Sequence, residues 1–355
     1  MPTANVLKVG IVGARRGRSF QAGLEACGAR IAALCDLNAD VLAESARLFG
    51  VAQTFTDYEL LLVDDASTDE SLDEIRKFSD PRMRLLHRDV PGPGGYAARN
   101  FGIKESRADW VAFLDGDDEW YPEHLHVLYD LVLESRGSLV AAGWFLNYGG
   151  DALRPNTFST FHAGSTRKTL SFSEFLNETA NGRMPMWTGT VAARRDLLQK
   201  VGGFPEHCRK GGDTAAWLRL VNGAGELIVS AQITAVYHRV DSFVTATIPP
   251  EVRDNCVYNA CKALLQEASD KRVSRLLKRV SNIHLGYGLR RRTREGSLRF
   301  SDCNAHYFTV DWKDHLFFRL HSLIPRWIQL GLRSRLAAIK QAISSPPPPG
   351  GSSAS

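Results

Sequence analysis

The sequence predicts an α/β protein with a doubly wound, mostly parallel sheet and a helical C-terminal region. Two observations support this fold class. Short apolar runs alternate with amphipathic helical segments up to residue 145, as in chains whose parallel strands are joined by crossover helices. Beyond Pro249 and Pro250 the helical pattern continues without further strands. The 355 residues are 44% hydrophobic and 23% charged, as in a globular protein of one large or two medium domains.

The expected elements follow one another in order. A β-α-β unit opens the chain, with strands at 7–13 and 30–36, and a further helical element covers 39–51. The run ELLLVDD at 59–65 is nearly continuous in apolar residues, which is typical of a strand covered on both faces. After it we expect helices at 70–78, 96–105, 172–178 and 195–201, and strands at 83–87, 110–115 and 139–145.

Two acidic clusters stand directly after predicted strands. VDDASTDES contains Asp64 and Asp65, and FLDGDDEW contains Asp115 and Asp117. The carboxyl ends of parallel strands border the crevice in which such sheets bind ligands. An Asp-x-Asp pair can hold a divalent cation that also bridges a diphosphate. Either cluster alone could be an Asp-rich turn or helix cap, but their repetition behind two strands favours a binding site.

A third acidic residue of interest is Asp213, where a Gly-rich loop leads into the helical segment GGDTAAWLRL. Aspartate is among the preferred residues at a helix N-cap. From the residues alone, a cap is therefore the more economical reading of Asp213.

Three blocks of the sequence carry a family resemblance. TFTDYELLLVDDASTDES, GGYAARNFGIKESRADWVAFLDGDDEWYPEHL and TGTVAARRDLLQKVGGFPE followed by GGDTAAWLRL resemble, in order and spacing, the family 2 glycosyltransferases of the GT-A fold. The likeness covers residues 53–240, about half of the chain. It implies a hexosyltransferase that moves a sugar from a UDP- or GDP-type donor to the hydroxyl of a saccharide or lipid-linked acceptor. It also implies inversion at the anomeric carbon and help from Mn²⁺ or Mg²⁺.

The resemblance assigns roles to the acidic residues. Asp65 would contact the nucleotide base, with Asp64 beside it. Asp115 and Asp117 would form the ribose- and metal-binding Asp-x-Asp pair. Asp213 would be the general base that takes the proton from the acceptor hydroxyl.

Five further residues take weaker roles under the same resemblance. Arg99 and Asn100 would frame the nucleotide site, although a solvated helix face is an equal alternative for Asn100. Trp187 would line the sugar or acceptor subsite, or else belong to the core. His238 and Arg239 would lie near the diphosphate. A departure from the family is Gly212, at a position that often holds Glu.

The N-terminal segment resembles a different family. The family 2 opening of the type VSVIIPxYN is absent, and residues 1–56 resemble instead the dinucleotide-binding start of the glucose-fructose oxidoreductase and inositol dehydrogenase (Gfo/Idh/MocA) family. In such a unit Gly13 and Gly17 would be the turn glycines at a pyrophosphate and Asp36 the acid on the ribose of NAD(P). The full GxGxxG pattern is missing. The chain therefore has the character of a chimera joined at 53–59.

The junction leaves three functional alternatives open. If the strand at 8–12 replaces the missing first strand, then Arg15, Arg16 and Arg18 would lie near the donor phosphates of an active glycosyltransferase. If it does not, the chain would be an inactive nucleotide-binding fusion. A third alternative is an NAD(P)-dependent oxidoreductase. The expected divisions are a Rossmann-like segment at 1–56, a catalytic domain at 57–245, a helical basic region at 250–343 and a disordered tail at 344–355.

The C-terminal region and the cysteines bear on location. Residues 271–343 carry 16 Lys or Arg against 4 Asp or Glu within a net charge of +5. Residues 314–343 read as a basic amphipathic helix that either lies on an anionic membrane surface or packs onto the catalytic domain. No nucleic-acid recognition motif accompanies the charge. The six cysteines show no CxxC pair, so we expect free thiols and a cytoplasmic protein, peripheral at the inner face of the membrane or free of it.

Overall fold

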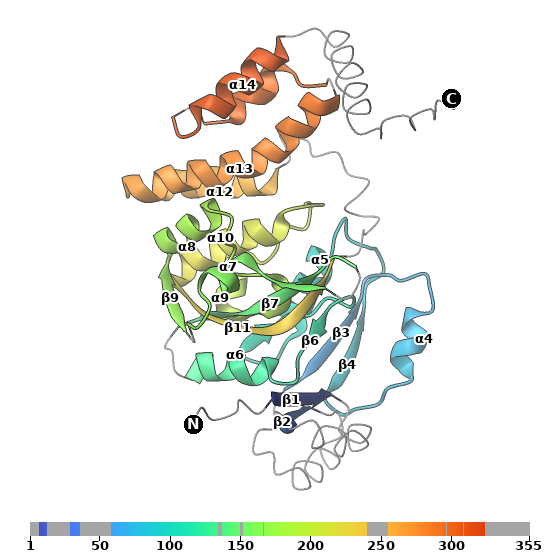
Figure 1. The fold of residues 1–355 in the computed structure, drawn as a ribbon. Helices are drawn as coiled ribbons and strands as arrows, with labels where there is room; N and C mark the ends of the chain where they lie inside the picture. Colours follow the sequence, from blue (N-terminus) through green and yellow to red (C-terminus); the bar gives the residue numbers. More distant parts are fainter. Residues whose placement is uncertain are drawn as a thin grey trace, which may run out of the picture.

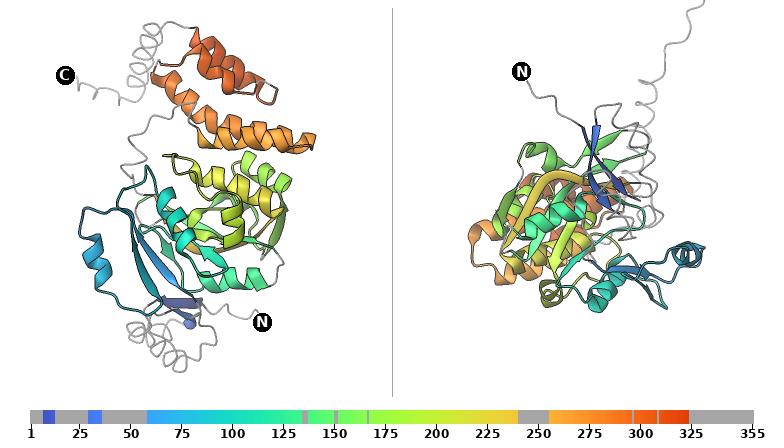
Figure 2. Two further views of the ribbon diagram at one scale, coloured as in Figure 1. Left: turned by 180° about the vertical axis from the view of Figure 1, so that it is seen from behind. Right: turned by 90° about the horizontal axis from the view of Figure 1, so that it is seen from below.

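The computed structural model describes residues 58–133, 137–149, 152–165, 167–239, 255–295, 297–307 and 309–323, and the backbone of the strands at 7–12 and 29–35. Figure 1 shows a central sheet between helices, a two-stranded sheet beside it and a second two-stranded sheet at the N-terminal end. The C-terminal helices lie at the opposite end of the molecule from the N-terminal strands (Figures 1 and 2).

The central sheet is mixed. It runs in the order β5 (Trp110–Ala112), β10 (Val191–Arg194), β7 (Leu139–Asn147), β11 (Glu226–His238) and β6 (Glu119–Trp120). Two further strands extend it, β8 (Leu153–Pro155) along β7 and β9 (Lys168–Ser171) along β11. Only the β7–β11 pair of this sheet is parallel.

The prediction of a mostly parallel sheet was therefore wrong for this part. Parallel neighbours need a crossover connection of about a dozen residues or more. The five residues between β7 and β8 allow only an antiparallel hairpin. Strand β10 also lies antiparallel to both of its neighbours.

Alternate side chains of β7 serve the two faces of the sheet. Leu139 and Ala141 belong to the large core on one face of the sheet, whereas Val140 and Ala142 belong to a second core on the other face. Because β7 is buried on both faces, its successive residues are apolar, and this continuous apolar run is the pattern that predicted the strand. The helices are α5 (Tyr96–Glu105), α6 (His124–Leu133), α8 (Phe172–Ala180), α9 (Arg195–Lys200) and α10 (Gly212–Ala224), with short turns α7 (Thr157–Phe161) and η2 (Thr188–Thr190) between them.

The small sheet beside the centre is the predicted β-α-β unit around the first acidic cluster. Strands β3 (Leu60–Asp64) and β4 (Met83–His87) are parallel, and α4 (Ser71–Arg76) lies in the connection between them. The expected strand at 83–87 and the expected helix at 96–105 are confirmed residue for residue. This sheet brings Asp64 to its carboxyl end.

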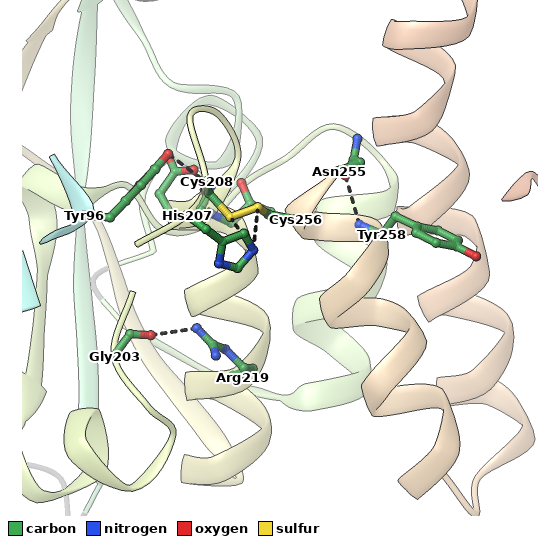
Figure 3. The surroundings of a disulfide bond; sticks show 11 residues. Tyr96, Gly203, His207, Cys208, Arg219, Asn255, Cys256 and Tyr258 are labelled. Carbon is green, nitrogen blue, oxygen red and sulfur yellow. Dashed lines mark hydrogen bonds between the residues drawn. A yellow bond between two sulfur atoms is a disulfide. The ribbon is translucent and has the colours of Figure 1, made fainter. Parts of the chain in front are cut away.

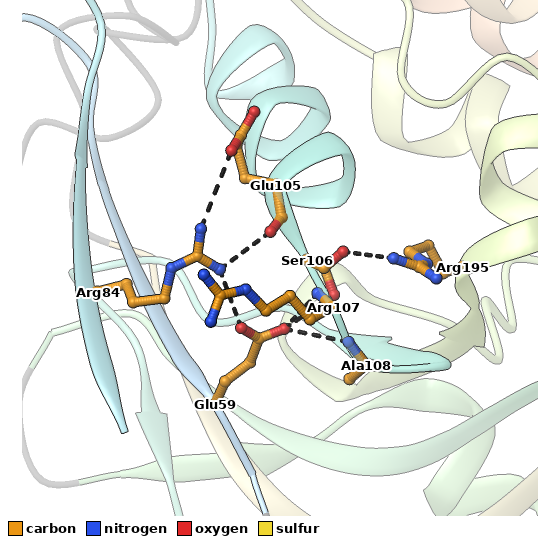
Figure 4. Close-up of polar contacts among 7 residues, drawn as sticks. All are labelled: Glu59, Arg84, Glu105, Ser106, Arg107, Ala108 and Arg195. Carbon is orange, nitrogen blue, oxygen red and sulfur yellow. Dashed lines mark hydrogen bonds and ion pairs between the residues drawn. The ribbon is translucent and has the colours of Figure 1, made fainter. Parts of the chain in front are cut away.

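A polar network attaches this small sheet to the rest of the domain (Figure 4). The Glu59 carboxylate accepts hydrogen bonds from the backbone N–H groups of Arg107 and Ala108 and from the Arg84 guanidinium. Arg84 also donates to the carbonyl oxygen of Glu105 at 3.0 Å. Burial acts to raise the pKa of Glu59, but these donors outweigh it, so the pKa lies below its ordinary value. The carboxylate therefore stabilises the junction between β3 and the end of α5.

Replacing Glu59 by glutamine is expected to lower the free energy of unfolding by about 1–2 kcal/mol at neutral pH, because charged hydrogen bonds are lost. A carboxyl group whose folded pKa is lowered contributes stability above its unfolded pKa of ~4.3 and loses it as the pH falls through the folded pKa. The difference between the two proteins should therefore shrink below about pH 4. Urea unfolding at pH 7 and pH 3.5 measures it, with the exposed Glu267→Gln as the matched control. An equal difference at both pH values would contradict this role.

The two N-terminal strands are present as expected. Strands β1 (Leu7–Val12) and β2 (Ala29–Cys35) are parallel neighbours. In the part of the chain that the structure describes, they pair with each other and with no strand of the other two sheets. The alternative in which the strand at 8–12 takes the place of a first strand in the catalytic sheet gains no support from this pairing. Gly13, Arg15, Arg16, Gly17, Arg18, Asp36 and most of the junction at 53–59 lie outside the described residues.

The C-terminal region is helical, as expected, and shares the large core of the central sheet. Helix α12 (Cys256–Glu267) packs on α10, and α13 (Lys271–Glu295) packs on α8. Their apolar side chains join the large core cluster. The end of α13, the turn η3 (Phe300–Ala305) and α14 (Trp312–Ser322) form a smaller cluster around the buried Phe318. None of the helices described is both long and apolar enough to cross a membrane.

The expectation of free thiols was wrong for one pair of cysteines. Cys208 and Cys256 form a disulfide between the loop before α10 and the first residue of α12. They are 48 positions apart in the chain, so no local spacing could indicate the pair. Cys261 and Cys303 are free, as expected, and both are buried.

Candidate active site

An arginine-carboxylate pair lies at the centre of the site. Arg99 on α5 donates from Nη2 to both oxygens of Asp115, at 2.6 and 2.7 Å. Its guanidinium also lies 5.6 Å from the ring centroid of Tyr96 and 5.5 Å from that of Phe204, within the range of cation–π attraction. The rings and the carboxylate fix the direction of Arg99, and α5 thus presents a held positive charge to the residues after β5.

Asp213 lies near the same positive charge, as the second residue of α10. The Thr214 N–H donates to its Oδ1 at 2.8 Å. Burial raises the pKa of the Asp213 carboxyl, and the negative charge of Asp115 adds to this, while Thr214 and Arg99 oppose it. A desolvated carboxylate of this kind is a stronger base than one in water.

The backbone before Asp213 is set by Tyr96. The Gly212 N–H donates to the Tyr96 hydroxyl at 3.0 Å. A Cβ at Gly212 would come within 2.7 Å of the Tyr96 ring, so a residue with a side chain does not fit there without rearrangement. Gly211 enters α10 with a φ of 75°, in the left-handed region that favours glycine. The Tyr96 ring therefore occupies the space of a side chain at position 212, where this chain has Gly and the family often has Glu.

The second acidic cluster offers more than the predicted Asp-x-Asp pair. Asp117 is exposed. Asp118 accepts the backbone N–H of His238 at Oδ1, at 3.0 Å, while its Oδ2 is buried without a hydrogen-bond partner among the described residues. Burial, together with the charges of Asp117 and Asp115, raises the pKa of Asp118 to about 7. The sequence pattern does not assign a role to Asp118, and its only signal there is its place directly after the pair.

The end of β11 meets this acidic run. The His238 ring contacts Asn147 Nδ2 through Nδ1 at 3.2 Å and Glu119 Oε1 through Nε2 at 3.2 Å. The Arg239 N–H donates to the Asn147 carbonyl, and its guanidinium lies 5.6 Å from the Tyr148 ring. His238 thus contacts the acidic run through its backbone N–H, at Asp118, and through its ring, at Glu119, whereas the Arg239 guanidinium lies near an aromatic ring.

Trp187 borders the site only through another ring. It stacks on Tyr237, with centroids 4.9 Å apart, and belongs to a buried cluster with Trp144. Burial and the charge of Asp118 raise the pKa of Tyr237, which places that phenol beside the carboxylates. Tyr237 is a neighbour of the site that the sequence pattern did not indicate. The packing alternative for Trp187 agrees with its 9% exposure.

The first acidic cluster performs two different local tasks. Asp64 is buried, and hydrogen bonds from Ser67 and from His87 Nδ1, the latter at 2.6 Å, hold its pKa below the ordinary value. Asp65 accepts from the Arg88 guanidinium and, at 3.1 Å, from the Gly92 N–H. Asp64 therefore shapes its own turn, while Asp65 reaches the loop that leads into α5.

Asn100 has a structural connection that neither expectation included. Its side-chain oxygen accepts the Phe204 N–H at 2.8 Å, and its Nδ2 donates to the Phe204 carbonyl and to Glu206 Oε1, both at 2.8 Å. Gly203 passes so close that a Cβ there would lie 2.4 Å from the Asn100 oxygen. Asn100 thus holds α5 to the loop that continues toward Asp213.

Taken together, the structure brings Arg99, Asp115, Asp117, Asp118 and Asp213 to one region. Asp117 has no hydrogen bond or ion pair among the described residues, and Asp118 has a buried oxygen without a partner. Arg99, whose guanidinium contacts this group, is already paired with Asp115. Carboxylate oxygens are the ligand type that Mg²⁺ and Mn²⁺ prefer, although among the described residues these aspartates do not form a group of three whose oxygens lie within 4.8 Å of one another.

The comparison with known proteins shows which family this region resembles. Residues 43–202 match the family model described as "Glycosyl transferase family 2". This region is therefore similar to the family 2 glycosyltransferase domain. The match begins inside the N-terminal segment, and the comparisons give no support to the oxidoreductase resemblance of residues 1–56.

Two curated relatives illustrate the similarity. The glycosyltransferase AglE of Haloferax volcanii is 32% identical over 173 residues, which are 47% of this chain and 52% of that protein. The uncharacterized glycosyltransferase YibD of Escherichia coli is 37% identical over 159 residues, which are 42% of this chain and 44% of that protein. The chain thus spans about half the length of these relatives, and 26% of a further glycosyltransferase from Rickettsia felis.

The fold of this domain also resembles a solved structure. The crystal structure of S. aureus TarS 1-349 in complex with UDP-GlcNAc aligns with this chain at a TM-score of 0.61 and 15% sequence identity. The alignment covers 78% of this chain and 83% of the TarS chain. The similarity confirms a GT-A-type α/β fold with a helical C-terminal region, built on a mixed sheet.

Proposed function

We propose that this protein is an inverting hexosyltransferase that transfers a sugar from a nucleotide diphosphate donor to an acceptor hydroxyl. The observation that carries the proposal is the convergence of Asp115 and Asp213 on Arg99, beside the carboxylates of Asp117 and Asp118. Such a set combines a desolvated base with a place for a cation and a diphosphate.

In the proposed reaction, Asp213 takes the proton from the acceptor hydroxyl as its oxygen attacks the anomeric carbon in a single displacement. The nucleoside diphosphate leaves from the opposite face. Asp115 and Asp117, with Asp118 beside them, would hold Mn²⁺ or Mg²⁺, which supplies positive charge to the departing diphosphate. Asp65 would contact the base from the neighbouring sheet, with Asp64 holding that turn.

The donor and acceptor classes follow from the relatives. The TarS structure contains UDP-GlcNAc. The E. coli protein WfgD, named as a UDP-Glc:alpha-D-GlcNAc-diphosphoundecaprenol beta-1,3-glucosyltransferase, is 34% identical over 88 residues. We therefore favour a UDP-sugar as donor and a saccharide or lipid-linked acceptor, as in the synthesis of a polysaccharide or glycolipid.

The C-terminal region would add a peripheral membrane contact. Helix α14 buries Phe318 but exposes Trp312, Leu316, Phe317 and Leu320, and Leu323 directly after it is also exposed. An interfacial helix presents large apolar side chains in this way. The proposed divisions at 57–245 and 250–343 would then separate the chemistry from the membrane contact, even though α12 and α13 share the catalytic core. The described residues stop at 323, so most of 314–343 and all of the tail at 344–355 lie beyond them.

The test is ligand-dependent stability of the full chain. UDP-sugars or GDP-sugars with Mn²⁺ are expected to raise the melting temperature, because a ligand at 100 times its Kd adds ~2.7 kcal/mol to the stability of the folded state. NAD and NADP, tested in parallel, are expected to cause no shift. A shift with NAD or NADP alone would favour the oxidoreductase alternative. A shift with a nucleotide sugar but no transfer or hydrolysis would favour the inactive fusion.

A further inference from the structure

The group around the disulfide is the strongest cluster of reactive side chains outside the proposed active site (Figure 3). His207 is exposed, and its Nε2 lies 3.7 Å from the Sγ of Cys208 and 3.9 Å from the Sγ of Cys256. Both cysteines are almost completely buried, at 2% and 4% exposure. Two sulfurs and an imidazole nitrogen thus meet where the loop before α10 touches the start of α12.

The same three atoms make a ligand set for a soft divalent cation. All lie within 4.8 Å of one another. Zinc takes thiolates and imidazole nitrogens in a tetrahedron, at ~2.3 Å and ~2.0 Å, which sets two sulfurs about 3.8 Å apart. The Cα atoms of the two cysteines are 6.3 Å apart, so rotation of the side chains is sufficient to open that separation.

We propose that His207, Cys208 and Cys256 bind a zinc-class cation once the disulfide has been reduced. A dithiol reductant supplies two electrons to the S–S bond and two protons to the sulfurs, and is itself oxidised to a disulfide. The cation then displaces the two thiol protons into the solvent, and the His207 nitrogen completes three protein ligands. Where thiols are kept reduced, cysteines in such a cluster are more often metal ligands than disulfides.

The fourth position of this cation faces solvent. Among the residues that the structure describes, no fourth His, Cys, Asp or Glu belongs to the group. The exposed His207 provides an entry path, and water would take the open position. The proposed site is distinct from the carboxylates of the active site, whose oxygens suit harder cations.

The location of the site gives it a consequence for the fold. The segment 207–211 leads directly to Asp213, and a Cβ at Gly211 would lie 3.2 Å from Val257, the second residue of α12. Both the disulfide and the bound cation would tie this segment to α12. The reduced protein without metal lacks either link, so it is the form in which the segment before Asp213 is least restrained.

Other cysteines of the described part do not compete for the reductant or the metal. Cys261 and Cys303 are buried, and burial raises the pKa of both thiols, that of Cys261 to about 12. The thiolate is the form that binds metal. Cys27 and Cys35 can be replaced by serine in every protein tested, so that any thiolate signal comes from the proposed pair.

The test uses the full chain in the Cys27→Ser, Cys35→Ser background, reduced with dithiothreitol and freed of it without air. A thiol count should rise by two on reduction of the folded protein. Titration with Co²⁺ should then give sulfur-to-cobalt charge-transfer absorption and the visible bands of a tetrahedral site, saturating at one equivalent. Zn²⁺ should abolish these bands, and the oxidised protein should show none.

Variants separate the site from unspecific binding. Cys256→Ser should remove most of the charge-transfer absorption, and His207→Ala should weaken cobalt binding by at least about tenfold. His207 is exposed, so its variant should retain the fold, and His126→Ala is the matched control. A disulfide that resists reduction in the folded protein, or bands that survive both variants, would overturn the proposal. Each result is independent of glycosyltransferase activity.

Discussion

Replacing Asp213 by asparagine is expected to lower the turnover number by about 10²–10⁴-fold, the usual contribution of a general base. Donor affinity should change little. The amide has the size of the carboxylate, and its oxygen can still accept the Thr214 N–H. What it lacks is the basic lone pair that takes the acceptor proton.

Initial rates with saturating donor and acceptor measure this loss, and calorimetry with the nucleotide sugar measures the affinity. The matched control is Asp196→Asn, an exposed aspartate at the start of α9 that pairs with Arg194. Equal turnover in the wild type and in Asp213→Asn would remove Asp213 from the mechanism. A parallel loss of melting temperature would assign it instead to the stability of α10.

The pH dependence of the transfer rate is a second test of Asp213. A base must be deprotonated to act, so activity should rise with pH through the pKa of Asp213. Burial raises that pKa, and the acid limb of the rate profile should therefore lie above the range of an ordinary aspartate, ~3.9. In Asp213→Asn this limb should disappear from the residual rate. An acid limb at the ordinary position would contradict the desolvated site.

Local patterns predicted the elements on which the site is built. The strand at 83–87 and the helix at 96–105 emerged with the expected bounds because apolar periodicity and the turn PGPGG define them within a few residues of chain. The same patterns predicted that Asp64 lies at the end of β3, of which it is the last residue, and that Asp115 follows β5, which ends at Ala112. The sequence thus indicated which acids stand at strand ends.

Contacts between distant segments were the part that the pattern could not predict. The antiparallel placement of β10 depends on its pairing with β5 and β7, and nothing in VAAR specifies a partner. Asp118 gained its significance from the His238 backbone, 120 positions away. Asn100 accepts a hydrogen bond from the backbone N–H of Phe204, 104 positions away. Each depends on tertiary geometry, which local propensity does not encode.

The C-terminal helices were predicted from the sequence, but their packing partners were not. Helical periodicity after Pro250 correctly predicted their existence. The buried faces of α12 and the first half of α13 join the core of the catalytic domain, with Cys261 and Leu277 fully buried. A sequence pattern shows that a helix face is apolar, but not which surface covers it.

Replacing Asp117 by alanine is expected to weaken metal-dependent donor binding by at least about 100-fold, the upper end of what the loss of a supporting group costs at a metal site. Asp117 is exposed and unpaired among the described residues, so its removal should leave the fold intact. The local charge supports this expectation. Arg99 is committed to Asp115, and the charges of Asp117 and Asp115 contribute to the high pKa of Asp118. A divalent cation would relieve that repulsion, and Asp117 is its most accessible carboxylate.

Calorimetry of the nucleotide sugar with Mn²⁺, and again with excess chelator, separates the two contributions. The wild type should bind well only with the metal, and Asp117→Ala should bind equally weakly under both conditions. Asp73→Ala, an exposed aspartate on α4, should behave as the wild type. Unchanged affinity in Asp117→Ala would show that Asp117 is a solvated turn residue without a role in metal binding. Binding by the wild type that does not depend on metal would show that the donor site needs no cation. A cation could also be held by Asp118 and Asp115 alone. In that case Asp117→Ala would remove only a neighbouring negative charge, and the metal-dependent donor affinity would fall by less than about tenfold.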